Sequence, residues 1–176
     1  FVIATQNPVE RGEGTFPLPE AQKDRFLVKT SLGYPDSDGE RTLLDRRDGR
    51  SVQMPSASQV LTTDAVRSWQ RVPEAVTVHD DLKDYIVETV RETREDSRVD
   101  VGVSPRGCQR LFEVTRGYAT LHGREYVTPD DVKAVAHPVL GHRLVLTADA
   151  TVDGTTREAV VGDVFEAVPV PSVGHG

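Results

Sequence analysis

The sequence has little of several residue types, and each scarcity excludes a class of protein. Its single cysteine, Cys108, excludes an internal disulfide and fits a reducing cytoplasm. No apolar run approaches the roughly 18 residues that a membrane-spanning helix needs. Lysine supplies only four of the 21 cationic residues, and the net charge of −7 argues against a general nucleic-acid binder, because phosphate-directed affinity requires clustered cations. We therefore expect a soluble cytoplasmic protein with no membrane span and no nucleic-acid partner.

Two short apolar runs, residues 1–4 (FVIA) and 26–29 (FLVK), have the composition of buried strands. Between them lies a loop rich in Gly and Pro. Asn7 follows the first run, where open α/β sheets place groups that touch a ligand. Arg25 comes just before the second run, which suggests a cation displayed on a surface. A lone strand pair cannot bury its faces, so we expect the sheet to have further partners.

After residue 35 the pattern becomes helical. Asp36 and its neighbours can cap a helix that runs to about Arg47, with an apolar face at Leu43 and Leu44. Thr62 and Thr63 precede a second helix, in which Trp69 is predicted to pack into the helical core.

Three further helices are predicted from apolar periodicity and capping signals. The first covers about 79–95, the second opens at Ser104-Pro105, and the third opens with a capping box at Thr128. Pro138 should kink or interrupt the third. The expected inner faces are Leu82, Tyr85, Ile86, Thr89 and Val90; Cys108, Leu111, Phe112, Thr115 and Ala119; and Val132, Val135, Ala136, Val139 and Leu140.

Several motifs then point to one family. ATQNP (4–8), GTFPLPEAQ (14–22) and DRF (24–26) resemble the sensor 1 strand and the following loop of the MoxR family of AAA+ ATPases. GVSPRG (102–107) and HGREYVTPDDVKAVAHPVLGHRLVL (122–146) resemble the helical lid domain of that family. TTREAVVGDVFEAVPVP (155–171) resembles its C-terminal helix. Together the matches cover nearly the whole chain.

The resemblance implies an α+β chain, mainly α, that joins the end of an αβα P-loop NTPase (AAA+) core to a helical lid. The expected parts are residues 1–36 for the remnant of the ATP-binding core, 37–147 for the lid, and 148–176 for the C-terminal helix and tail.

The resemblance also gives roles to three residues. Asn7 matches sensor 1, which touches the γ-phosphate or orients the attacking water; alternatively it is a turn former, since Asn-Pro starts turns. Arg25 matches the arginine finger, whose planar and permanently charged fork stabilises phosphoryl charge; alternatively it is an exposed cation paired with Asp24.

Arg106 matches sensor 2. A cation at the second position of a helix is unfavourable with respect to the helix dipole, and a nucleotide phosphate at that helix end would relieve the conflict. The alternative is a salt bridge to a carboxylate such as Glu125.

The histidines and the cysteine do not indicate a further site. His122, His137 and His142 do not make a metal set by their spacing, so we expect surface or helix-end histidines and no metal site. Cys108 is predicted to be a small core residue.

The 176 residues contain neither a GxxxxGK[ST] phosphate loop nor an Asp-Glu pair after an apolar run, so we expect no ATP turnover by this chain alone. In a longer protein, the resemblance implies ATP hydrolysis with Mg²⁺ in a homo-oligomeric ring. The energy would drive chaperone-like remodelling or maturation of a client, with a von Willebrand A domain protein as the usual partner type. The alternatives are a non-catalytic helical interaction module and a lid from another AAA+ branch such as magnesium chelatase.

Overall fold

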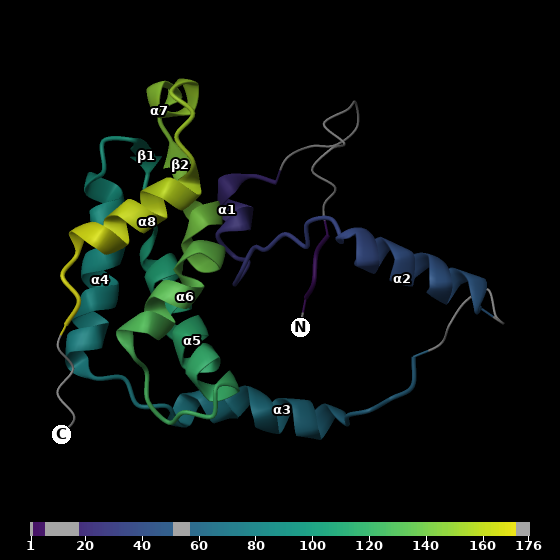
Figure 1. The fold of residues 1–176 in the computed structure, drawn as a ribbon. Helices are drawn as coiled ribbons and strands as arrows, with labels where there is room; N and C mark the ends of the chain where they lie inside the picture. Colours follow the sequence, from purple (N-terminus) through teal and green to yellow (C-terminus); the bar gives the residue numbers. More distant parts are fainter. Residues whose placement is uncertain (1, 6–17, 51–56, 172–176) are drawn as a thin grey trace.

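The computed structural model describes residues 2–5, 18–50 and 57–171. Within these ranges the chain is mainly helical, with one small two-stranded sheet (Figure 1). The α-helices are α1 (Glu20–Lys23), α2 (Ser37–Asp48), α3 (Thr63–Arg71), α4 (Asp80–Glu95), α5 (Pro105–Leu121), α6 (Pro129–Leu140), α7 (Ala148–Val152) and α8 (Arg157–Ala167). The 3-10 helices are η1 (Val72–Ala75) and η2 (Gly141–Arg143), and the strands are β1 (Val99–Val101) and β2 (Val145–Leu146).

The hydrophobic core lies among α4, α5, α6 and α8. Helix α5 packs on α4 and α6, and α8 packs on the same two helices. The predicted inner faces of α4 and α6 are buried in full, which confirms the periodicity argument. On α5 the residues Leu111, Thr115 and Ala119 are buried, and Cys108 and Phe112 are partly buried against the core.

Side-chain caps explain where the core helices begin. The hydroxyls of Ser104, Thr128 and Thr156 accept hydrogen bonds from the backbone N–H groups three residues later. At Thr128 the Asp131 carboxylate also accepts from the backbone N–H of Thr128, so the predicted capping box is present. Pro138 does not interrupt α6, which continues to Leu140. The expected interruption is therefore absent, and the expected kink stays a prediction.

The two predicted strands do not form. Residues 2–4 of the first run and 26–29 of the second have no strand conformation, and Val2 and Ile3 are exposed. Strands need a neighbouring strand to pair their backbone groups, and neither run has one within the described part of the chain. The sheet that does form is elsewhere: β1 pairs antiparallel with β2, with Val99 opposite Leu146.

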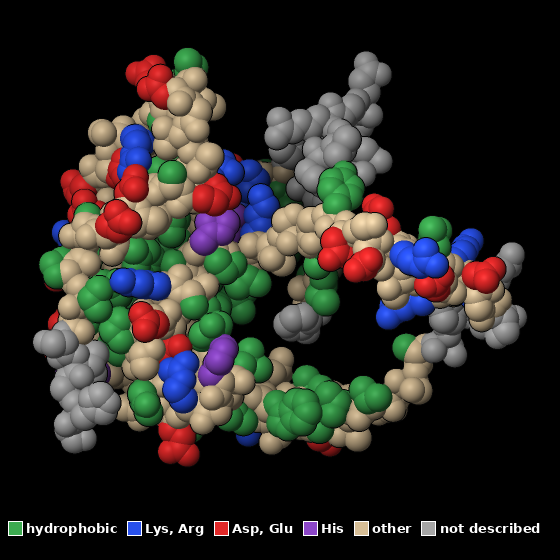
Figure 2. All heavy atoms as spheres, viewed as in Figure 1, with side chains coloured by type: hydrophobic (Ala, Val, Ile, Leu, Met, Phe, Trp, Pro, Cys, Tyr) green, Lys and Arg blue, Asp and Glu red, His purple; other side chains and the backbone are tan. Residues whose placement is uncertain are grey.

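Helices α2 and α3 form at the predicted places but bury no residue. Asp36 and Thr62 are their N-caps. Figure 1 shows α2 standing apart from the helices of the core. The expectation that Trp69 packs inward was wrong, since this residue is 60% exposed. The apolar stripe of α3 faces away from the core, and Figure 2 shows hydrophobic side chains along this helix.

Candidate functional site

Asp24 lies at the point where the N-terminal segment meets the helical core. Helix α1 begins after Pro19 and ends at Lys23, and the turn that follows it presents the Asp24 carboxylate to the start of α5 and to η2. Three side chains approach this carboxylate: Ser104 Oγ donates at 3.2 Å, Arg106 Nη1 lies 3.4 Å away, and Arg143 Nε donates at 3.1 Å. Figure 2 shows Lys and Arg side chains gathered where α1 meets the core.

Arg143 is the most deeply buried of these groups, with a side chain only 1% exposed. Its Nη2 donates to the backbone oxygens of Phe26 at 2.5 Å and Asp24 at 3.2 Å. Its Nη1 donates to the backbone oxygen of Val139 and lies 3.5 Å from that of Leu27. Burial lowers the pKa of the guanidinium and Asp24 opposes the shift. An arginine nevertheless stays charged in proteins, so Asp24 provides its counter-charge.

His142 lies beside Arg143 and is buried as well. Its Nε2 is 2.8 Å from Arg143 Nη1 and 3.2 Å from the backbone oxygen of Phe26. Because a guanidinium has only donors, the contact with Arg143 requires Nε2 to accept. Burial, followed by the charge of Arg143, lowers the pKa of His142 to about 4. His142 lies in η2 directly after α6, so its predicted place at a helix end is confirmed, but it is neutral and buried, so the predicted surface position is wrong.

Gly107 makes room for this arrangement. A Cβ at this position would lie 2.4 Å from Val103 Cγ1 and 2.9 Å from Arg143 Cδ. Both distances are too short for real carbon contacts, so only glycine lets the stem of Arg143 pass the first turn of α5.

The structure describes two of the three predicted site residues, Arg25 and Arg106. Asn7 lies outside the described residues. Arg25 is exposed, and no ion pair of its side chain is found within the described ranges. Arg106 lies in the first turn of α5, is half exposed, and pairs with Asp24. Asp24 thus turns toward Arg106 and Arg143, so the pairing with Arg25 that the sequence left open is absent. The alternative for Arg106, a salt bridge to a carboxylate, is present, with Asp24 as the partner in place of Glu125. The functional roles of all three residues stay predictions.

Sequence reasoning did not identify Asp24 and Arg143 as a pair. One signal was available, because Arg143 interrupts the apolar run VLGHRLVL (139–146), and a charged residue among core residues needs a buried partner. The partner itself could not be found, since it lies 119 residues earlier in the chain.

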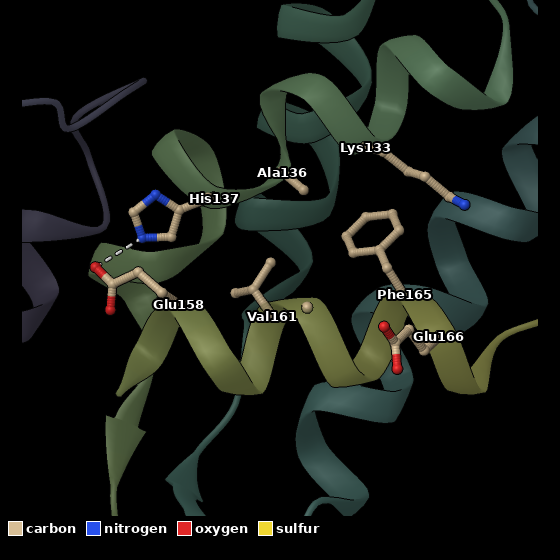
Figure 3. A pocket seen from close by; sticks show the side chains of 8 residues that line it. Lys133, Ala136, His137, Glu158, Val161, Phe165 and Glu166 are labelled. Carbon is tan, nitrogen blue, oxygen red and sulfur yellow. Dashed lines mark ion pairs between the residues drawn. The ribbon is translucent and has the colours of Figure 1, made fainter. Parts of the chain in front are cut away.

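A hollow lies between α6 and α8 (Figure 3). Ala136, Val161 and Phe165 line it with apolar side chains, and His137 Nε2 lies 3.0 Å from Glu158 Oε1 at one end. It shares no residue with the Asp24 cluster. In the described part of the chain, no group of His, Cys, Asp or Glu side chains has the arrangement of a metal site. None of the described helices is long and apolar enough to cross a membrane.

Comparisons with known proteins give the class of this chain. A family model described as "AAA lid domain" matches residues 91–164. Another, described as "ATPase family associated with various cellular activities (AAA)", matches residues 1–28. A crystal structure of a proposed ATPase from Cytophaga hutchinsonii is 31% identical, superimposes with a TM-score of 0.84, and covers 95% of this chain and 53% of its own. The chain is therefore the end of an AAA domain followed by an AAA lid domain.

The relatives narrow the class. The uncharacterized protein YeaC of Bacillus subtilis is 43% identical over 97% of this chain and 53% of its own length. Chaperone MoxR1 of Mycobacterium tuberculosis is 40% identical over 98% of this chain and 47% of its own length. Protein MoxR of Paracoccus denitrificans is 30% identical over 97% of this chain. The chain belongs to the MoxR family of AAA ATPases and corresponds to its C-terminal portion. It spans about half the length of the curated relatives it matches.

Proposed function

We propose that this chain supplies the arginine finger and the nucleotide sensors of a MoxR-type ATPase. In this proposal Arg25 acts on the ATP of a neighbouring subunit, Arg106 senses nucleotide phosphate as sensor 2, and Asn7 serves as sensor 1. ATP and Mg²⁺ bind to the longer protein, because the 176 residues include no phosphate loop.

The observation that carries the proposal is the exposed side chain of Arg25 beside an anchored neighbour. Ser104 and Arg143 bind the carboxylate of Asp24, whereas the side chain of Arg25 forms no ion pair with a carboxylate of the described ranges. A finger that reaches into another subunit requires such an exposed and uncommitted guanidinium. Its planar fork can then stabilise charge on the phosphoryl oxygens in the transition state.

Arg106 fits a different task. It sits at the positive end of α5, where its own charge is unfavourable and an anion is favoured. In this structure the carboxylate of Asp24 is the anion nearby, at 3.4 Å from Nη1. The contact is half exposed and therefore weak, so a nucleotide phosphate can replace it.

For the whole protein we propose a homo-oligomeric ring that couples ATP hydrolysis to remodelling or maturation of a client. One relative carries the name chaperone, which supports this role. The MoxR family resemblance suggests a von Willebrand A domain protein as partner.

The test is subunit mixing in the longer protein. Arg25→Ala and a phosphate-loop lysine substitution each damage one half of a shared site, and each alone should lower kcat about 10³-fold or more. Mixed rings contain some interfaces with both halves intact, so activity should partly return. Arg47→Ala, which removes another exposed arginine, on α2, should leave kcat unchanged.

Two results would count against the proposal. No recovery in mixed rings that exchange subunits would exclude action across the interface. No ATPase activity in the wild-type ring would favour the non-catalytic interaction module instead.

A further inference from the structure

Residues 24–29 follow an irregular path over the helical core. They form no strand, so their backbone oxygens have no sheet neighbour to donate to them. Backbone oxygens that are buried away from water need hydrogen-bond donors. At one end of the segment the Lys29 N–H donates to the Pro138 oxygen at 2.8 Å, and the rest of the attachment comes from side chains.

One side chain makes most of these contacts. Arg143 donates to the backbone oxygens of Asp24 and Phe26, lies 3.5 Å from that of Leu27, and pairs with the Asp24 carboxylate. The same guanidinium donates to Val139 at the end of α6. A guanidinium has five N–H donors in a fixed plane, so it can satisfy several acceptors at one fixed geometry.

The other face of the Asp24 carboxylate contacts the first turn of α5. Ser104, the N-cap of this helix, donates to it, and Arg106 pairs with it. A single carboxylate thus joins the segment that carries Arg25 to the helix that carries Arg106, and the buried Arg143 holds that carboxylate in place.

We propose that Arg143 is a positioning residue, which fixes residues 24–29 on the core and thereby sets where Arg25 stands relative to Arg106. The link from position to ATP hydrolysis rests on the proposed function, whereas the docking of the segment does not. A phosphate that draws Arg106 away from Asp24 changes the charge balance at the carboxylate next to Arg25. The ion pair of Asp24 and Arg143 therefore connects the segment that carries Arg25 to the helix that carries Arg106.

Hydrogen exchange on the 176-residue chain tests the docking without any nucleotide. Arg143→Met keeps the length of the side chain and removes its donors and charge. We expect exchange across residues 24–29, including the Lys29 amide, to become about tenfold faster or more, while α4 keeps its protection. Unchanged exchange in this segment would overturn the proposal.

Two further variants separate docking from general destabilisation. Arg124→Met breaks a similar ion pair, with the buried Asp131, at the other end of α5, and should leave exchange of residues 24–29 unchanged. Gly107→Ala keeps the charge of Arg143 but pushes its stem aside, so it should accelerate exchange of residues 24–29 even if Arg143→Met does not fold. Equal acceleration by Arg124→Met would reduce Arg143 to an ordinary core residue and refute its positioning role.

Kinetics in the longer protein test the second step. Arg143→Met should lower kcat about tenfold or more, with a smaller effect on KM. Adding it to Arg25→Ala should cause little further loss, because Arg143 is proposed to act on kcat through the position of the Arg25 guanidinium, which Arg25→Ala has already removed. A purely structural loss would multiply in the double variant, and that result would refute the positioning of Arg25. If Arg25→Ala alone leaves kcat unchanged, the proposed function fails, and the exchange experiment then decides the docking by itself.

Discussion

His142 and Arg143 are adjacent in the chain and both are buried, which forces one of them to remain neutral. Burial, and after it the charge of the neighbouring Arg143, lowers the pKa of the imidazole to about 4, while the guanidinium keeps its proton. His142 thus links the attachment of residues 24–29 to pH.

We expect acid to destabilise the protein through His142. In the unfolded chain this histidine takes up a proton near its ordinary pKa of 6.5, whereas in the folded chain it does so only near 4. Between these two values the unfolded state binds more protons, so the free energy of unfolding decreases as the pH falls from 6.5 to 4, by at most about 3 kcal/mol. Urea denaturation at a series of pH values measures this slope. His142→Gln should flatten it and His122→Gln, at an exposed site, should not; equal slopes in both variants would contradict the assignment.

Trp69 gives a second prediction for a single residue. Because its side chain is 60% exposed, Trp69→Ala should change the free energy of unfolding by less than about half a kcal/mol. Leu111→Ala, at a fully buried position of α5, should cost about 2–5 kcal/mol. Chemical denaturation of both variants measures the contrast. A large loss for Trp69→Ala would show that α3 packs against something in solution.

At the scale of helices, the effect of an N-cap threonine on the free energy of unfolding depends on whether its helix belongs to the core. Thr62 and Thr128 each accept a hydrogen bond from the N–H group three residues later. Thr128→Ala should lower the free energy of unfolding by about 1 kcal/mol or somewhat more, because α6 belongs to the core. Thr62→Ala should fray α3, with little effect on global unfolding, because α3 buries no residue. Denaturation curves together with hydrogen exchange of α3 test both, and equal global losses would be the contradicting outcome.

The sequence predicts the core helices well and the attachments between segments poorly. Periodicity identified the buried faces of α4 and α6, since each helix packs along one continuous stripe. The same argument failed for Trp69, because a stripe shows which residues share a face and not whether anything covers that face. Apolar composition also predicted strands at residues 1–4 and 26–29. The described residues of these runs, 2–4 and 26–29, have no strand to pair with in the described part of the chain.

The candidate site shows the same limit. The motif around Arg106 and the cap at Ser104 could be identified locally, since both depend on a few neighbouring residues. The carboxylate that pairs with Arg106 could not, because Asp24 lies 82 residues earlier and its own neighbour Arg25 was the nearest candidate partner. Long-range ion pairs leave no periodic pattern in a sequence.

For the molecule as a whole, the buried cluster runs from Val76 to Val168, whereas the boundaries predicted from the sequence were 37–147 for the lid. Those boundaries stay a prediction. Because α2 buries no residue, trypsin should cut early at its exposed arginines Arg41, Arg46 and Arg47 and leave the Val76–Val168 part intact. Mass spectrometry of a digestion series identifies the fragments. A long-lived fragment that begins near residue 37 would contradict this and support the predicted boundary.

The ion pair between Asp24 and Arg143 also sets an order of events during synthesis. The two residues are 119 positions apart, so the segment that carries Arg25 leaves the ribosome long before its anchor exists. At typical elongation rates the interval is roughly 6–24 s, which is far longer than a helix needs to form. During that interval residues 24–29 lack Arg143, their principal hydrogen-bond donor. Residues 24–29 can therefore attach to the core only after Arg143 has been synthesised.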